Sequence, residues 1–197
     1  MDPAQFVGSL GWLGDEGLVT VSGDQLTMRA GPNSDWFNDP DSGTRLSSAP
    51  VFCAAVTEDC QLSANVAVAF ASAFDAGVLF VHQTDDDYAK LCFEQAPGGE
   101  HMVVSVVTRG VSDDANGPRI DGDTVRLRVS RFRDVIAFHW STDATTWNLL
   151  RYFQLRDPSA QTVLGFLAQS PTGQGCTATF SDISYTSATP ADIRDGS

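Results

Sequence analysis

The feature that most constrains this chain is a long succession of short strand-like segments divided by turn residues. Apolar and polar residues alternate along the segments, and runs such as Thr84–Asp87, Asp114–Gly117 and Asp121–Asp123 separate them. Gly, Asn, Asp and Pro in such runs favour tight turns, so neighbouring strands are expected to pair antiparallel. We therefore predict an all-β fold, a two-sheet antiparallel jelly-roll sandwich with under about a tenth of its residues in helix.

The expected strands share period-two alternation or a short apolar run. They are Leu18–Val21, Gln25–Arg29, Val51–Ala55, Cys60–Ala69, Ala76–Gln83, Tyr88–Glu94, His101–Thr108, Thr124–Ser130, Val135–Ser141, Trp147–Phe153, Val163–Gln169 and Cys176–Thr186. A length of 197 residues suits one domain. We expect residues 1–186 to form that domain, and residues 187–197, which include Pro190 and Gly196, to be a flexible C-terminal tail.

Charge limits the classes of partner. The chain has 25 acidic and 12 basic residues, with a net charge of -13. Such a surface repels nucleic-acid phosphates and anionic lipids, so we expect no nucleic acid and no membrane partner. Neutral or cationic ligands are favoured. A carbohydrate or another hydroxyl-rich small molecule is of the neutral kind, and a protein partner stays open. The first residues show no basic and apolar leader, so a cytoplasmic location is expected.

The cysteines and the acidic turns are the residues that could form disulfide bridges or bind a metal ion. The four cysteines are Cys53, Cys60, Cys92 and Cys176. Their spacing is not that of a zinc site, and we expect four reduced thiols, with a Cys53–Cys60 bridge as the alternative. We expect no metal and no cofactor. Calcium at Ser112–Asp114 or Asp85–Asp87 is the alternative, although it needs six to eight converging oxygens.

The single lysine of the chain, Lys90, lies in the middle of a predicted strand. Alternation puts Tyr88, Lys90, Cys92 and Glu94 on one face of this strand, opposite Leu91. Lys90 and Glu94 are roughly 13 Å apart along the strand, too far to pair directly. Each needs another partner, so this face is either a polar ligand site or a solvent-exposed sheet face. On the first interpretation, we expect replacement of Lys90 by Met to impair binding more than folding.

The core is predicted on the other face of the same strand. The side chains expected to be buried and to face away from Lys90 are Leu91, Phe93, Val104, Val106, Leu127, Val129 and Phe138.

Several segments together resemble the DUF1349 family. They include Trp36–Pro40, Phe74–Val78, Asp87–Glu94, Val106–Asp113, Leu127–Val129, Trp140–Trp147 and Leu150–Arg151. The resemblance covers roughly residues 10 to 185 and implies a concanavalin A-like lectin/glucanase sandwich. The family includes yeast proteins described as regulators of enolase and domains attached to carbohydrate-active enzymes. One departure is Ala144, where many members have Gly after the Asp. The segment Ser141–Trp147 is predicted to form a turn in which Ser and Asp side chains hold backbone amides.

The acids argue against an ordinary glucanase. Glucanases of this fold carry a Glu-x-Asp-x-Glu triplet on one strand, and this chain has none. Only Glu94 among the glutamates lies on a predicted strand, so a second carboxylate must come from an Asp such as Asp75. The favoured hypothesis is a carbohydrate-recognition or regulatory binding domain. The alternative is an atypical carbohydrate-active enzyme, a glycosidase or lyase acting on a modified sugar.

The candidate site residues are donors, acceptors and aromatic rings expected to share the Lys90 face. For ligand binding they are Lys90, Glu94, Tyr88, His82, Arg109, Arg128 and Trp36. If the protein is an enzyme, the candidates are Glu94 or a histidine such as His139 as base and Lys90 as electrostatic stabiliser.

Overall fold

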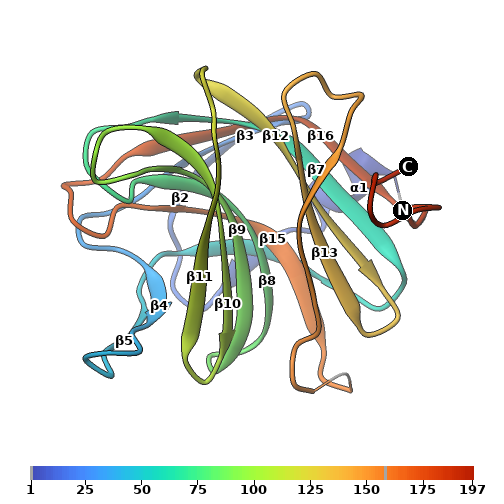
Figure 1. The fold of residues 1–197 in the computed structure, drawn as a ribbon, viewed down its shortest axis with the longest axis horizontal. Helices are drawn as coiled ribbons and strands as arrows, with labels where there is room; N and C mark the ends of the chain where they lie inside the picture. The colour runs from blue at the N-terminus through green and yellow to red at the C-terminus, as the bar shows by residue number, and fades with distance from the viewer. Residues whose placement is uncertain (1, 158) are drawn as a thin grey trace.

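The computed structural model describes residues 2–157 and 159–197 and consists almost entirely of antiparallel strands (Figure 1). The elements are α1 (Pro3–Gly8), β1 (Gly11–Leu13), β2 (Leu18–Ser22), β3 (Gln25–Arg29), β4 (Trp36–Asn38), β5 (Arg45–Ser47), β6 (Val51–Val56), β7 (Cys60–Ala69), β8 (Ala76–Thr84), β9 (Asp87–Gln95), β10 (His101–Arg109), β11 (Ser112–Arg119), β12 (Thr124–Phe132), β13 (Val135–Ser141), β14 (Asn148–Phe153), β15 (Thr162–Gln169) and β16 (Thr177–Thr186). The predicted all-β sandwich is confirmed.

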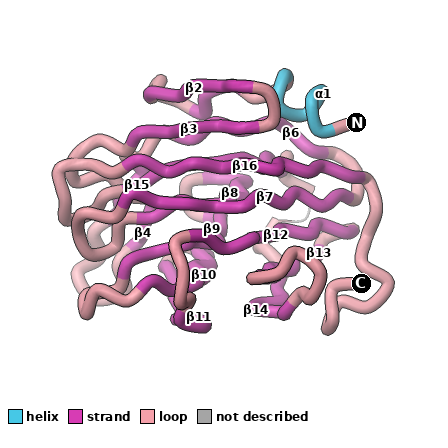
Figure 2. Tube along the Cα trace, turned by 90° about the horizontal axis from the view of Figure 1, so that it is seen from above, coloured by secondary structure: helices cyan, strands magenta, loops and turns pink. Residues whose placement is uncertain are grey.

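Two sheets of seven strands pack face to face. Sheet A has the order β1-β6-β15-β8-β9-β10-β11, and sheet B has the order β14-β13-β12-β7-β16-β3-β2 (Figure 2). The short β4–β5 hairpin forms a separate two-stranded sheet, which lies beside sheet A in Figure 1. Every pairing between the named strands is antiparallel, as expected for strands joined by tight turns.

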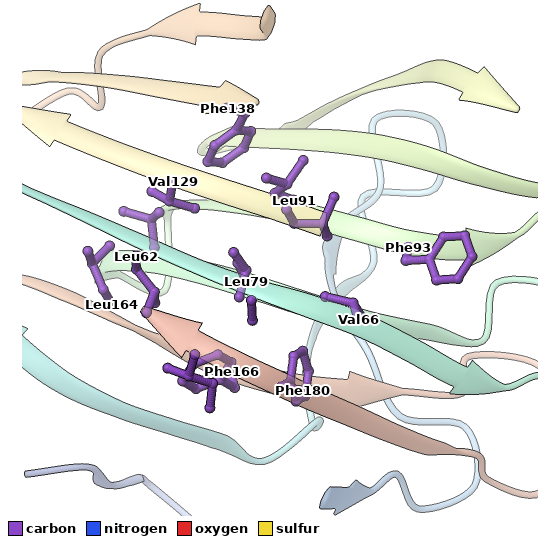
Figure 3. Close-up of a cluster of buried hydrophobic side chains, with 14 of the residues drawn as sticks. Leu62, Val66, Leu79, Leu91, Phe93, Val129, Phe138, Leu164, Phe166 and Phe180 are labelled. Atoms are coloured by element: carbon purple, nitrogen blue, oxygen red, sulfur yellow. The ribbon is translucent and has the colours of Figure 1, made fainter. Parts of the chain in front are cut away.

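The main core lies between the sheets and is built by alternation. Inward side chains of both sheets interdigitate there, among them Leu62, Val66, Leu79, Leu91, Phe93, Val129, Phe138, Leu164, Phe166 and Phe180 (Figure 3). All ten are buried, and Phe166 packs on Phe180 with ring centroids 4.9 Å apart. The predicted core positions Leu91, Phe93, Leu127, Val129 and Phe138 are confirmed.

Val104 and Val106 are buried, but the prediction that they face away from Lys90 is wrong. In the β9–β10 pairing Val106 stands opposite Lys90 and Val104 opposite Cys92. Directly opposed residues of an antiparallel pair point to the same face. Val103 and Val107 supply the inward side chains of β10 instead.

A second apolar cluster covers the outer face of sheet A. Trp36 of β4 packs against Phe80, His82 and Tyr88, with ring centroids 5.1, 5.4 and 5.3 Å away. Its indole Nε1 donates to the Ala49 carbonyl at 2.7 Å. Sheet A is therefore buried on both faces around β8 and β9. The interpretation of the Lys90 face as an open, solvent-exposed sheet face is wrong.

One predicted turn and one alternative from the sequence need correction. The stretch Asp114–Gly117, predicted as a turn, lies inside strand β11 at the edge of sheet A. A Cys53–Cys60 bridge does not form, because the Cys53 side chain belongs to the outer cluster of sheet A and that of Cys60 to the main core. All four cysteines are free and buried. Strands β1, β4, β5 and β11 and helix α1 were not predicted.

Candidate functional site

The cross-strand register of sheet A places polar groups around an apolar floor. One row across β9, β10 and β11 is Lys90, Val106 and Asp114, and the next row is Cys92, Val104 and Asn116. A third row brings Gln169 of β15 and Glu94 of β9 onto the two sides of Ala76. The valines supply apolar surface, and the polar residues stand at both ends of the rows.

These rows form the wall of a pocket of about 490 Å³, here called the Lys90–Glu94 pocket. It is lined by Asp35, Phe37, Asp39, Phe74, Lys90, Glu94, Ala96, Pro97, Val104, Val106, Asp114, Asn116, Gln169, Pro171 and Thr172. The volume lies within the range of small-molecule pockets, and an apolar lining with a few convergent polar groups is typical of them.

Lys90 is held in place at the base of the pocket. Its side chain is only 2% exposed, and its Nζ donates to Asp35 Oδ1 at 2.8 Å and to Gln169 Oε1 at 2.9 Å. Burial by itself lowers the pKa of Lys90, but the Asp35 carboxylate, together with Cys92 and Glu94, raises that pKa overall. The ammonium therefore stays charged and joins the segment before β4 to β15. Of its three protons, two have acceptors among the described residues.

Glu94 differs from Lys90 because its carboxyl group has no hydrogen-bond partner among the described residues. Burial raises the pKa of Glu94 to about 8, with Lys90 opposing the increase and Asp35 and Asp114 adding to it. The group is therefore mainly protonated at neutral pH. A neutral carboxyl both donates and accepts hydrogen bonds, and a hydroxyl group needs both.

Two aromatic rings border the pocket. Phe37 of β4 lies with its ring centroid 5.9 Å from Lys90 Nζ. Phe74 is 38% exposed and has a φ of 69°, a left-handed conformation that L-residues other than Gly rarely adopt. Its amide donates to the Gln95 carbonyl at 2.7 Å, and its carbonyl accepts from Gln169 Nε2 at 3.3 Å. The strained backbone thus holds an exposed ring at the rim of the pocket.

Asp75, which the sequence offered as a second carboxylate, has a structural role. Its Oδ1 accepts from Ser170 Oγ at 2.6 Å, and its Oδ2 accepts from the amides of Ala71 and Ser72 at 2.9 Å each. The side chain is fully buried. Asp75 therefore fixes the loop that carries Phe74 and does not line the pocket.

The structure separates the predicted site residues into groups. Lys90 and Glu94 line the pocket together. Tyr88 and His82 belong to the same face of sheet A, and Trp36 of β4 packs against both of them in the outer apolar cluster. Burial lowers the pKa of His82. Their roles in ligand binding remain predictions.

Three other residues do not lie on the Lys90 face, so the prediction of a single face containing them is wrong. Arg109 ends β10 and stands directly opposite Asp87 of β9. It therefore shares the face of sheet A that carries Ala89, which is the face opposite to that of Lys90. Arg128 and His139 stand opposite each other in β12 and β13, which belong to sheet B. Alternation within one strand gives no information on which sheet the strand joins.

The residues that sequence reasoning missed are Asp35, Phe37, Phe74, Asp114, Asn116 and Gln169. Asp114 and Asn116 carried a usable signal, because two polar residues two positions apart share one strand face. Asp114, Asn116 and Gly117 instead led to the prediction of a turn. The stretch lies in an edge strand, where Pro118 is tolerated. Nothing local to Asp35 indicates its contact with Lys90, which is 55 residues away.

The described residues, 2–157 and 159–197, contain neither a metal-binding cluster of side chains nor a helix suited to cross a membrane. No group of three or more His, Cys, Asp or Glu side chains in these ranges is arranged to hold a metal ion, including at the two acidic turns named for calcium. No helix in these ranges has the length and apolar character that a membrane crossing requires.

Comparison with known proteins adds a family. A family model described as a protein of unknown function (DUF1349) matches residues 12–188. The chain belongs to the DUF1349 family. Ala144, where the resemblance led us to expect Gly, has a φ of 61° in this DUF1349 domain. The neighbouring Asp143 accepts from the amides of Thr145 and Thr146 at 2.8 and 2.7 Å, as predicted for the turn.

Solved structures share the fold of this DUF1349 domain. A functionally unknown protein from Saccharomyces cerevisiae has a TM-score of 0.80 at 23% identity, covering 91% of this chain and 97% of that one. The GH43 protein BlXynB from Bacillus licheniformis has a TM-score of 0.66 at 14% identity, covering 83% of this chain but 33% of its own. The alginate lyase from Klebsiella pneumoniae has a TM-score of 0.54 at 13% identity, with coverages of 86% and 84%. No curated protein matches the sequence.

Proposed function

We propose that this DUF1349 domain binds a carbohydrate, or a similar neutral hydroxyl-rich molecule, in the Lys90–Glu94 pocket. The observation that carries the proposal is the buried Glu94 carboxyl, which lines a pocket with an apolar floor and has no hydrogen-bond partner among the described residues. Burial raises its pKa, which favours the neutral form. A neutral acid, the Asn116 amide and the Thr172 hydroxyl are donors and acceptors that suit sugar hydroxyls. The GH43 and alginate lyase names of its structural neighbours come from carbohydrate chemistry and agree with this ligand class.

The aromatic rings support the same ligand class. Sugar rings present apolar C–H faces as well as hydroxyl edges, so a pocket for them needs apolar surface beside polar groups. Phe74 supplies an exposed ring at the rim, and Val104 and Val106 supply the floor. Lys90 is already paired with Asp35, so the charge in the base of the pocket is balanced and a neutral ligand fits it.

The test is a glycan array followed by calorimetric titration of the best glycan into three full-length proteins. Asn116→Ala removes a pocket amide at an exposed position of edge strand β11, where a change in folding is expected to be small. Asn148→Ala, at an exposed position of edge strand β14 in sheet B, is the matched control. We expect Asn116→Ala to lower the affinity about fivefold, since one lost hydrogen bond costs about 1 kcal/mol, and Asn148→Ala to leave it unchanged. The absence of any bound glycan, or equal affinities for the three proteins, would contradict the proposal.

One observation favours the enzyme alternative enough to test it. A carboxyl with a pKa near 8 has the protonation state that a general acid needs at neutral pH. Asp114 is the pocket carboxylate that stands in the Lys90 row, and it replaces Asp75 as the candidate second group. Incubation of bound glycans with the protein, followed by measurement of new reducing ends and of unsaturated products, distinguishes the two functions. Turnover that disappears in Glu94→Gln while binding persists would establish a glycosidase or lyase.

A further inference from the structure

The outer face of sheet B carries a polar array that the Lys90–Glu94 pocket does not use. The register places Arg128 between His139 of β13 and Ser63 of β7, with Ser184 of β16 beyond Ser63. The next row contains Ser130, Gln61 and Thr186. The inward neighbours of these residues, such as Leu127, Val129 and Leu62, belong to the main core, so the polar residues face outward.

A groove of about 350 Å³ lies on this face, here called the Arg128 groove. It is lined by Gln61, Ser63, Arg126, Arg128, Ala144, Trp147, Ser184 and Thr186. The lining therefore combines two guanidinium groups, three hydroxyls, one amide and one indole. Its volume suits a single small molecule.

Arg128 is buried without an anionic partner. The residue is 8% exposed, and among the described residues no carboxylate lies within ion-pair distance of it. Within the described part of the chain its one hydrogen bond runs from Nη2 to the Gly196 carbonyl at 2.5 Å, and its buried Nε has no partner there. Burial lowers the pKa of Arg128 to about 10, so the group still carries its charge at neutral pH. In a chain with a net charge of -13, a buried arginine without a carboxylate calls for a ligand that supplies one.

The guanidinium is also held in a fixed orientation. Its Cζ lies 4.0 Å from the centroid of the Trp147 ring, a cation–π contact that fixes the plane of the guanidinium. The C-terminal segment closes one side of the array, because Gly196 accepts from Arg128 and the Ile193 carbonyl lies 2.9 Å from His139 Nε2. Figure 2 shows this segment running beside β12 and β13. A planar fork held in this way matches a carboxylate.

From these observations we infer that the Arg128 groove is a second ligand site, which binds a small hydroxylated carboxylate of the sugar-acid class. The carboxylate pairs with Arg128 and Arg126, and the hydroxyls of the ligand meet Ser63, Ser184, Thr186 and Gln61. Arg126 already donates to the Asp182 carbonyl at 3.0 Å, and its Nη1 lies 4.0 Å from the exposed Asp182 carboxylate. Its side chain is 19% exposed, so it reaches the groove from its rim. The site lies in sheet B and is independent of the ligand proposed for sheet A.

The test is calorimetric titration of the full chain with three probes: glucuronate, glucose and inorganic sulfate. Glucose has the hydroxyls without the carboxylate, and sulfate has the charge without the hydroxyls. We expect glucuronate to bind at least tenfold more tightly than either of the others. Arg128→Gln should lower the glucuronate affinity at least tenfold, and Arg126→Gln, at a more exposed position, several-fold.

Two control variants locate the effect. Arg119→Gln alters an arginine with a side chain 66% exposed on β11, and it should leave glucuronate binding unchanged. Asn116→Ala alters the Lys90–Glu94 pocket and should also leave it unchanged, which separates this inference from the proposed function. Equal binding of glucose and glucuronate overturns the inference, as does equal binding of sulfate and glucuronate. If Arg128→Gln does not fold, the comparison of probes with the unaltered protein and the Arg126→Gln result decide the matter.

Discussion

The raised pKa of Glu94 predicts how the free energy of unfolding depends on pH. Burial raises the pKa of this carboxyl from 4.5 to about 8, in a site where Lys90, Asp35 and Asp114 are the charged neighbours. Between these two pKa values the folded protein retains a proton that the unfolded chain has released. The free energy of unfolding therefore falls as the pH rises through this window. The pKa values differ by about 3.5, and at about 1.4 kcal/mol for each pKa unit the full loss is roughly 5 kcal/mol, as an order of magnitude.

Urea denaturation of the unaltered protein and of Glu94→Gln at pH 5, 6, 7 and 8 measures this loss. The amide does not titrate, so Glu94→Gln should become the more stable of the two as the pH approaches 8. His82 and His139, whose pKa values are lowered mainly by burial, act in the opposite sense and contribute stability that is lost as the pH falls below about 6.5. Subtracting the two curves removes the histidine contributions. Glu16→Gln, at an exposed loop position, should run parallel to the unaltered protein. A Glu94→Gln curve that is also parallel would refute the reasoning.

Four further outcomes are expected. Lys90→Met should lower the free energy of unfolding by about 3 to 5 kcal/mol in urea melts, because Asp35 is left charged and buried, and adding Asp35→Asn should restore part of it. Phe93→Ala should cost about 3 to 5 kcal/mol, and a near-zero change would contradict its place in the core. Ala144→Gly should raise the melting temperature, because an Ala in the left-handed conformation costs about 1 to 2 kcal/mol that Gly does not. The greater entropy of Gly in the unfolded chain offsets part of this gain. The four thiols should react with Ellman's reagent only on unfolding, because each is buried and burial raises the pKa of each.

The strands were predictable because alternation is a local signal. Leu91 and Phe93 face the core as their spacing requires, and the turns between most strands lie where Gly and Asp cluster. Register and sheet membership are not local. Val104 was assigned to the wrong face because the sequence does not show which residue of β10 stands opposite Cys92. Arg128 looked equivalent to Lys90 by alternation alone, although the two side chains point out of opposite sheets.

The candidate site shows the same limit in its chemistry. The sequence indicated that Lys90 and Glu94 each need a partner other than one another. In the structure Lys90 has two such partners, and Glu94 has none among the described residues. Lys90 is hydrogen-bonded to Asp35 and Gln169, so its main effect is on stability. We therefore expect Lys90→Met to impair folding more than binding, whereas the sequence alone led us to expect the opposite. Glu94 has no such partner among the described residues, and its carboxyl is the group left for a ligand. Lys90 therefore holds the elements of the pocket together, and we propose that Glu94 forms hydrogen bonds with the ligand.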